Sequence, residues 1–155
     1  VSNSLNNFDM NDINSHLAAI QQGIGKEFSN SPSPFSHWLK PIVRSAEAGA
    51  LIFEYRIRKD MTNPMQVLHG GVSAGIIDDV IGATVFTMNL SHHFTTINNY
   101  IDYFAPAHEG DIIEARSSVV KRGKQIINLQ CELWLPVKNR LIVRGYSNMI
   151  RLEQV

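Results

Sequence analysis

Apolar positions recur along the chain at two spacings, and the change between them separates predicted helices from predicted strands. Steps of three or four residues come first, at Ile13, Leu17, Ile20, Ile24 and Phe28. This spacing predicts an amphipathic helix over residues 11–28, with Asn11 or Asp12 as its N-cap. The Asn- and Ser-rich residues 1–10 are expected to form a flexible tail, and residues 11–155 a single domain.

A period of two, typical of strands, follows. An extended pattern begins at Phe35, and apolar residues then alternate with more polar ones from Leu51 to Arg58. Residues 47–49 have the composition of a tight turn, so a strand over about 38–46 is expected to pair with this second strand as a hairpin. Four further strands are predicted, over residues 95–105, 111–121, 125–135 and 140–152, and the short turns between the last three predict an antiparallel meander.

Between the two groups of strands, residues 71–89 carry apolar side chains around most of a helix's circumference: Val72, Ile76, Ile77, Val80, Ile81, Val85, Phe86 and Met88. A helix that is apolar nearly all round is buried, so this one is expected in the middle of the molecule. The order of elements predicts an α+β fold, in which one antiparallel sheet wraps around one long central helix and an extra helix precedes it.

The composition of the chain argues against nucleic-acid and membrane partners. Fourteen basic residues balance fourteen acidic ones and form no basic stripe, so no nucleic-acid partner is expected. Cys131 is the single cysteine, no apolar run approaches the ~20 residues of a membrane span, and the first residues lack the regions of a signal peptide. A cytoplasmic protein with no membrane partner is expected.

Hydrophobic residues reach 44% and charged residues only 18%, which leaves apolar surface for an oligomer to cover.

The first candidate for chemistry is Gly70-Gly71, which lies where a polar loop enters the central helix. The first N–H groups of a helix lack internal partners and bind anions. Glycine lets a substrate carbonyl approach them, so these N–H groups would stabilise a developing oxyanion. Alternatively, the two glycines form only a tight turn between loop and helix.

The second candidate is the pair Asp78 and Asp79, which lie inside the apolar helix. A desolvated carboxylate has a raised pKa and suits general-base work. Gly75 and Gly82 border both residues, and glycine inside a helix costs about 1 kcal/mol relative to alanine, which suggests close packing by a backbone or a ligand. The alternative is that one carboxylate faces solvent or caps a strand, and helical geometry alone does not separate the two.

The spacing of these candidates predicts an assembly. Gly70 and Asp78 are eight residues apart, which is about 12 Å along a helix. A general base acts within about 3 Å of its target, directly or through one water. The two groups therefore cannot readily share one carbonyl within a chain, but they would meet if two such helices passed each other across a two-fold axis.

Other residue types favour structural roles. His92-His93 has no further ligand at metal spacing, so no metal site is expected. Cys131 alternates with leucines in a strand and is predicted to lie in the core. His69 either donates a hydrogen bond or holds the loop. The chain lacks a Gly-x-Ser-x-Gly elbow and a phosphate-binding glycine loop, which argues against a serine hydrolase and a nucleoside-triphosphate enzyme.

Asn63, His69-Gly70-Gly71 and Asp78, at their spacing in this chain, resemble the signature of hotdog-fold acyl-CoA thioesterases of the phenylacetate-degradation type. The segment from Thr96 to Pro106 is similar to the strand that follows the central helix in that family, and with residues 109–111 the resemblance spans roughly residues 50–150. It implies a hotdog fold and hydrolysis of acyl-CoA without a cofactor, coenzyme A being part of the substrate. It also implies sites shared across a homodimer, often within a dimer of dimers.

The resemblance also implies residue roles. Gly70 would supply the N–H that binds the oxyanion, next to Gly71. Asn63 and His69 would shape the loop and orient the thioester. Asp78 rather than Asp79 would be the catalytic carboxylate, and Thr96 would help to place the water. Lys121, Arg122 and Lys124 lie in a turn where phosphates of coenzyme A would bind, although a solvated basic turn is the simpler explanation of these residues.

The chain departs from the family pattern at Gln66, where the family commonly has glycine, so the loop that carries Asn63 is expected to follow a different path. The extra N-terminal helix would cover a sheet edge or line the acyl pocket. Asp78 would act either as a general base toward water or as a nucleophile that forms an anhydride. The alternatives to a thioesterase are an enoyl-CoA hydratase on the same fold, which needs a paired Asp and His, and a non-enzymatic acyl-CoA binding or regulatory protein.

Overall fold

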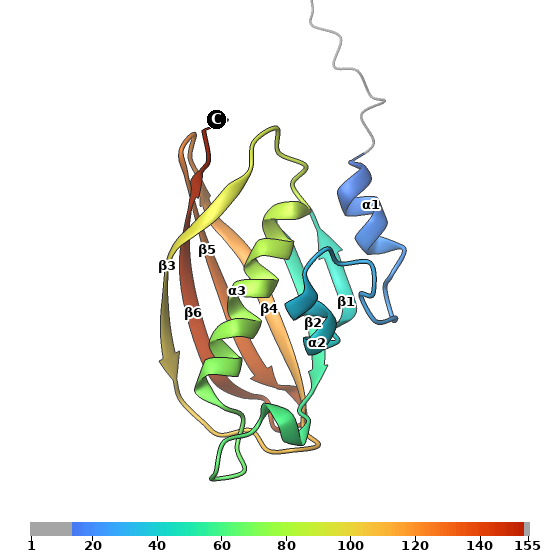
Figure 1. Ribbon diagram of the computed structural model, residues 1–155, viewed down its shortest axis with the longest axis vertical. Coiled ribbons are helices and arrows are strands. Elements are labelled where there is room, and N and C mark those ends of the chain that lie inside the picture. The colour runs from blue at the N-terminus through green and yellow to red at the C-terminus, as the bar shows by residue number, and fades with distance from the viewer. Residues whose placement is uncertain (1–13, 154–155) are drawn as a thin grey trace, which may run out of the picture.

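A six-stranded antiparallel sheet and one long helix dominate the computed structural model, which describes residues 14–153 (Figure 1). The sheet order is β1-β2-β4-β5-β6-β3. In chain order the elements are α1 (Ser15–Gln21), α2 (Pro34–Leu39), β1 (Ile42–Glu47), β2 (Ala50–Arg56), η1 (Lys59–Met61), α3 (Gly70–Phe86), β3 (Phe94–Tyr103), β4 (Ile112–Arg122), β5 (Ile126–Leu135), η2 (Pro136–Lys138) and β6 (Arg140–Arg151). The predicted α+β hotdog architecture, with its extra N-terminal helix, is confirmed.

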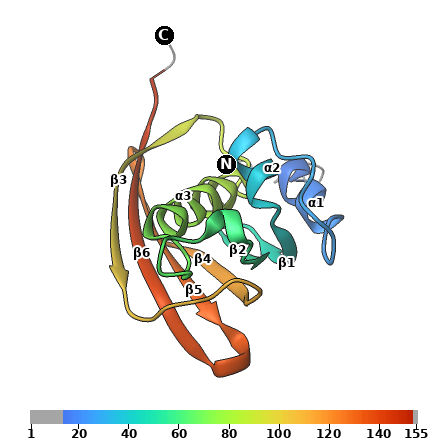
Figure 2. The same cartoon turned by 60° about the horizontal axis from the view of Figure 1, so that its bottom comes forward.

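The long helix α3 lies in the concave face of the sheet (Figure 2). One side of it is buried against the strands, through Ser73, Ile76, Ile77, Val80, Ile81 and Thr84. In the protomer the opposite side is only partly covered, and Asp78 and Phe86 are exposed. Apolar side chains therefore lie around more of the helix surface than one sheet can cover. Figures 1 and 2 place β3 along one flank of α3, and α1 and α2 along the other.

The N-terminal helix is shorter than predicted. α1 ends at Gln21 rather than continuing to residue 28, and Asn14 is its N-cap, with its side-chain oxygen accepting from the Leu17 N–H at 3.0 Å. The two predicted caps, residues 11 and 12, lie outside the described residues. Gly25 adopts a φ of 83°, which glycine tolerates without strain and which turns the chain out of the helix.

Beyond this turn the chain runs along β1 and covers that edge of the sheet. The Gly25 N–H donates to the Val43 carbonyl at 2.8 Å, and the Phe28 N–H donates to the Pro41 carbonyl at 2.8 Å. Isolated bridges also join Ile24 to Val43 and Glu27 to Ile42. An edge covered in this way is not available for pairing with another strand.

A helix replaces the first half of the extended segment predicted from Phe35. The Ser33 hydroxyl caps α2 by accepting from the Ser36 N–H at 3.2 Å, and Pro34 occupies its first turn, where the missing N–H costs nothing. Lys40, with a φ of 55°, ends the helix. The prediction of a strand from about residue 38 was wrong at its start, because the Ser33 cap and Pro34 begin a helix that runs to Leu39 and β1 begins only at Ile42.

The other strands agree with the sequence. The hairpin of β1 and β2 turns at Gly49, whose φ is 80°, and β4, β5 and β6 form the predicted meander. Of the described strands, β6 alone pairs with β3, which forms the second edge of the sheet. Cys131 lies fully buried in the core between sheet and helix, as expected.

Candidate active site

Asp78 lies on the flank of α3 that faces β3, and it is held by two side chains of that strand. Its Oδ1 accepts from the Thr96 hydroxyl at 3.0 Å and from the Asn99 Nδ2 at 2.9 Å. The residue is exposed, and within residues 14–153 no hydrogen bond is made to its second oxygen, Oδ2. One oxygen thus fixes the carboxylate while the other is free to take a proton or to attack an electrophile.

Asn99 was not predicted as a site residue, and a β-bulge explains why. Strict alternation would place Thr96 and Asn99 on opposite faces of β3, since they are three residues apart. The pairing with β6 instead shifts between Thr96 and Asn98, so that one extra residue is inserted into β3. The bulge brings both side chains to the helix-facing side of the sheet. Bulges of this kind have no reliable signature in a single sequence.

The start of α3 presents a free backbone donor. His69 is the N-cap, and its Nδ1 accepts from the Gly71 N–H at 2.9 Å. Within the described chain, no acceptor hydrogen-bonds to the N–H of Gly70. Of the two candidate glycines, Gly70 therefore has the donor available for a substrate oxygen, whereas the donor of Gly71 is already used.

Tyr103 is a second residue that the sequence did not single out. Its hydroxyl donates to the Gly70 carbonyl at 3.0 Å, and its ring lies against Gly70, where a Cβ would stand 3.5 Å from the ring. Tyr103 is on the same face of β3 as Asn99, because the two are four residues apart beyond the bulge. One strand therefore contacts both the carboxylate and the helix start.

Asn63 holds the loop that leads to α3. Its side-chain oxygen accepts from the N–H groups of Met65, at 2.9 Å, and Val67, at 3.3 Å. Gln66 has a φ of 61°, the left-handed conformation that glycine adopts more readily. The glutamine therefore takes up a glycine-like backbone geometry, and Asn63 closes the turn around it.

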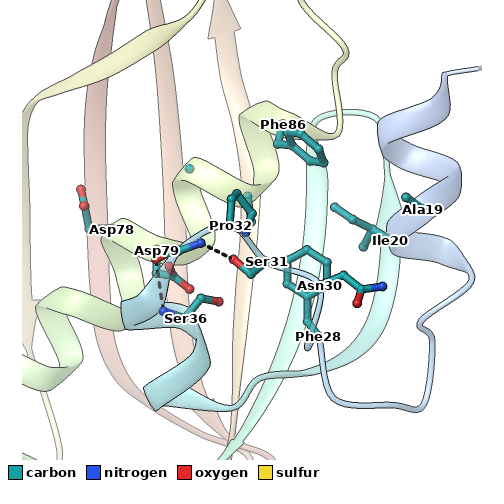
Figure 3. Close-up of a pocket in the computed structure, with 13 residues that line it drawn as sticks. Ala19, Ile20, Phe28, Asn30, Ser31, Pro32, Ser36, Asp78, Asp79 and Phe86 are labelled. Atoms are coloured by element: carbon teal, nitrogen blue, oxygen red, sulfur yellow. Dashed lines mark hydrogen bonds between the residues drawn. The ribbon is translucent and has the colours of Figure 1, made fainter.

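Asp79 faces the other flank of α3, toward Ser36 and the loop before α2 (Figure 3). Its Oδ2 is buried, and among residues 14–153 it has no hydrogen-bond partner. Burial raises the pKa of Asp79, the nearby Ser36 and Ser33 hydroxyls offset part of this rise, and the negative charge of Asp78 adds to it. The two adjacent carboxylates thus lie in different surroundings, which the sequence left open.

The two helix glycines beside these carboxylates differ in their packing. A Cβ on Gly75 would stand 2.6 Å from the Phe35 ring of α2, so this position serves the close packing of α2 on α3. A Cβ on Gly82 would meet nothing within 4 Å. The inference that both glycines allow close packing is therefore supported at Gly75 only, and Gly82 instead borders open space.

The basic residues proposed for coenzyme A lie far from Gly70 in the same protomer. Arg122 and Lys124 line a cavity with Leu90 and His92, which follow the C-terminal end of α3. Gly70 begins this 17-residue helix, so the length of the helix, about 25 Å, separates the two regions. Contact of Lys121, Arg122 or Lys124 with a substrate held at Gly70 would need the Gly70 of a second protomer.

Other candidate chemistries find little support in the described part of the chain. Burial strongly raises the pKa of the Cys131 thiol, so it is not an ionised nucleophile at neutral pH. Within residues 14–153, no three His, Cys, Asp or Glu side chains gather as a metal site, and the expectation of no metal stays a prediction. None of the described helices is long and apolar enough to cross a membrane.

Comparison with known proteins agrees with the fold and with the similarity to thioesterases. The model of the Thioesterase superfamily matches residues 65–139. Acyl-coenzyme A thioesterase 13 of Homo sapiens is 27% identical over 101 residues, which cover 65% of this chain and 72% of that protein. Two solved structures share the fold. The E. coli PaaI protein from the phenylacetic acid degradation operon has a TM-score of 0.76 and 16% identity, over 90% of this chain and 97% of its own. The smu.793 protein of Streptococcus mutans, bound to acetyl CoA, has a TM-score of 0.67 and 16% identity, over 72% and 88%.

The fold, the helix start with its carboxylate and these matches point to one class: the chain has the hotdog fold, and its sequence is similar to thioesterases. The predicted similarity to the phenylacetate-degradation type is confirmed, because the PaaI protein and the curated acyl-CoA thioesterase are both among its relatives.

Proposed function

We propose that the protein hydrolyses acyl-CoA thioesters at a site shared by two protomers, with Asp78 of one and the Gly70 N–H of the other. The observation that carries the proposal is the pairing of Asp78 with Thr96 and Asn99, which leaves one carboxylate oxygen free on a helix whose first N–H, that of Gly70, is unused within the described chain. No metal or cofactor is required for this chemistry, and none is proposed.

The reaction proceeds by one of two routes. In the first, the free oxygen of Asp78 takes a proton from water, which attacks the thioester carbonyl. In the second, Asp78 attacks the carbonyl itself, and water hydrolyses the resulting anhydride. In both, the Gly70 N–H and the dipole of α3 stabilise the oxyanion, and the coenzyme A thiolate leaves and is then protonated.

A homodimer is needed because the two groups are about 12 Å apart along one helix. β3 offers the surface for it: it is an edge strand, and Ile97, Tyr100 and Tyr103 are 50%, 64% and 55% exposed. Exposed apolar side chains on an open edge favour pairing with another chain. The opposite edge, β1, is already covered by residues 24–28. Pairing of β3 with β3 across a two-fold axis would bring two α3 helices together.

We further propose a dimer of dimers and a cytoplasmic location, which rest on the resemblance and on composition. The acetyl CoA bound to the Streptococcus mutans protein supports an acyl-CoA ligand for this fold. In the proposed dimer the basic hairpin of Lys121, Arg122 and Lys124 would bind phosphates of the coenzyme A held at the partner's helix start. The hydratase alternative is not favoured, because the side chains that hydrogen-bond to Asp78 are a threonine and an asparagine rather than a histidine.

The test is hydrolysis of a panel of acyl-CoA thioesters, followed by release of free coenzyme A, together with the molar mass in solution. The shared site is tested by mixing two inactive variants, Asp78→Asn and Gly70→Pro, which lacks the Gly70 N–H. Mixed dimers contain one intact site, so activity is expected to return to about a quarter of wild type at full random exchange. A monomer with full activity, or no recovery in mixed dimers shown to form, would contradict the proposal.

A further inference from the structure

A cavity of about 410 Å³ lies on the flank of α3 that carries Asp79. The N-terminal part of the chain forms one wall, through Ala19, Ile20, Phe28 and the loop before α2, and α3 forms the other, from Asp78 to Phe86 (Figure 3). At roughly 30 Å³ per water-sized group, this volume holds on the order of a dozen non-hydrogen atoms. It is within the range of small-molecule pockets and suits an acyl group of medium length.

Its walls are mainly apolar, with the carboxyl groups of Asp78 and Asp79 among them. Ile20, Phe28, Ala83 and Phe86 provide carbon surface, while Asp79 lines the cavity with a carboxyl group whose Oδ2 is buried and, among residues 14–153, has no hydrogen-bond partner. An unpartnered buried acceptor is costly and rare in folded proteins. A ligand donor would hydrogen-bond to the carboxyl group of Asp79 where this residue lines the cavity, whereas a purely apolar ligand would desolvate the group further.

The cavity reaches the proposed catalytic carboxylate. Asp78 and Gly82 both line it, and they are one turn apart on the same side of α3. Since a Cβ at Gly82 would meet nothing within 4 Å, the helix surface there is open. An acyl group whose carbonyl lies beside Asp78 can therefore cross α3 over Gly82 and enter the cavity.

We infer that this cavity binds the acyl group of the substrate and that Asp79 selects acyl groups that carry a hydrogen-bond donor, a hydroxyl or an ammonium group. The inference rests on the proposed function, because it takes Asp78 as the reacting carboxylate. It assigns the N-terminal segment, which also covers the β1 edge, to substrate selection. Asp79 is a specificity residue here and takes no part in breaking the thioester bond.

The test compares four thioesters of one chain length: hexanoyl-CoA, 3-hydroxyhexanoyl-CoA, 6-hydroxyhexanoyl-CoA and 6-aminohexanoyl-CoA. For the wild type, kcat/KM is expected to be about 10- to 100-fold higher for at least one donor-bearing substrate than for hexanoyl-CoA. Asp79→Leu is expected to abolish or reverse this preference. Asp79→Asn keeps an acceptor but loses the charge, so a preference retained in this variant identifies the hydroxyl, and one lost identifies the ammonium group. Glu47→Gln, an exposed acid at the end of β1, is the matched control.

A second variant tests the route independently of Asp79. Gly82→Leu places a side chain at the crossing point, and it is expected to lower kcat/KM for hexanoyl-CoA by at least tenfold while acetyl-CoA loses little. Equal wild-type rates on all four thioesters, or a preference unchanged in Asp79→Leu, would overturn the inference and leave the thioesterase intact. If no thioester is hydrolysed, the proposed function fails, and calorimetric binding of the four thioesters to wild type and Asp79→Leu still decides the inference.

Discussion

Asp78 and Asp79 are neighbours in sequence and chemically identical, yet they face opposite flanks of α3 with different surroundings. Asp78 is exposed, is held by Thr96 and Asn99, and has one oxygen free. Asp79 lines a mainly apolar cavity, and one of its oxygens is buried with no hydrogen-bond partner in the described part of the chain. The comparison teaches that a helix gives adjacent residues separate environments, so one short segment can supply a reacting group and a selecting group.

The largest expected effect comes from removing the free carboxylate. Asp78→Asn keeps the shape and the bonds from Thr96 but removes the base or nucleophile, so kcat is expected to fall by about 10²- to 10⁴-fold. Steady-state hydrolysis of the best acyl-CoA measures this, with Glu47→Gln as a control for protein quality. If Asp78→Asn retained wild-type kcat, Asp78 would not be the reacting group.

The next effect concerns the side chains that orient Asp78. Thr96→Val removes the hydroxyl without changing the shape, and kcat is expected to fall about tenfold with little change in KM, because a hydrogen bond to a charged group is lost. Thr96→Ser restores a hydroxyl and is expected to recover most of the rate. Equal rates for the Val and Ser variants would show that the hydroxyl does not position the carboxylate.

The pH dependence of stability distinguishes the two carboxylates further. Burial raises the pKa of Asp79 above its ordinary value of 3.8, so between that value and the raised pKa the folded state binds more protons than the unfolded state. The free energy of unfolding therefore decreases as pH rises through this window. Asp79→Asn removes this decrease. The free energy of unfolding of the variant, relative to that of the wild type, is therefore expected to rise from about pH 3 to pH 7.

Denaturant unfolding of both proteins across this range, at one fixed protein concentration, measures the effect. Glu47→Gln replaces an exposed acid by its amide in the same way and should show no such trend. Parallel stability curves for wild type and Asp79→Asn would contradict the buried environment of Asp79.

The smallest effects come from the two glycines. Gly82→Ala adds a Cβ into open space and improves helix propensity, so unfolding is expected to cost up to about 1 kcal/mol more. Gly75→Ala gains the same propensity but must displace the Phe35 ring, so it should be the less stable of the two variants. Thermal unfolding measures both, and equal stabilities would indicate that Phe35 moves without cost.

Much of the fold could be predicted from local patterns. The period of two in β2 and the meander, the turn at Gly49 and the long apolar α3 all follow from interactions between near neighbours in the chain. The errors lie where a few residues outweigh the pattern: Ser33 and Pro34 begin α2 within an apparent strand, and Gly23 and Gly25 end α1 early. The site was predictable only in part, because Asn99 and Tyr103 reach it from a different element.

The sequence by itself determined which groups are available: a glycine helix start, two carboxylates on the same helix and a threonine in the following strand. Tertiary structure alone decided how they are used. The bulge in β3 turned Asn99 toward Asp78, and the N-terminal segment closed a cavity over Asp79. The physical reason is that a side chain's hydrogen bonds and burial depend on distant segments that fold against it. A local sequence pattern does not specify which segments these are.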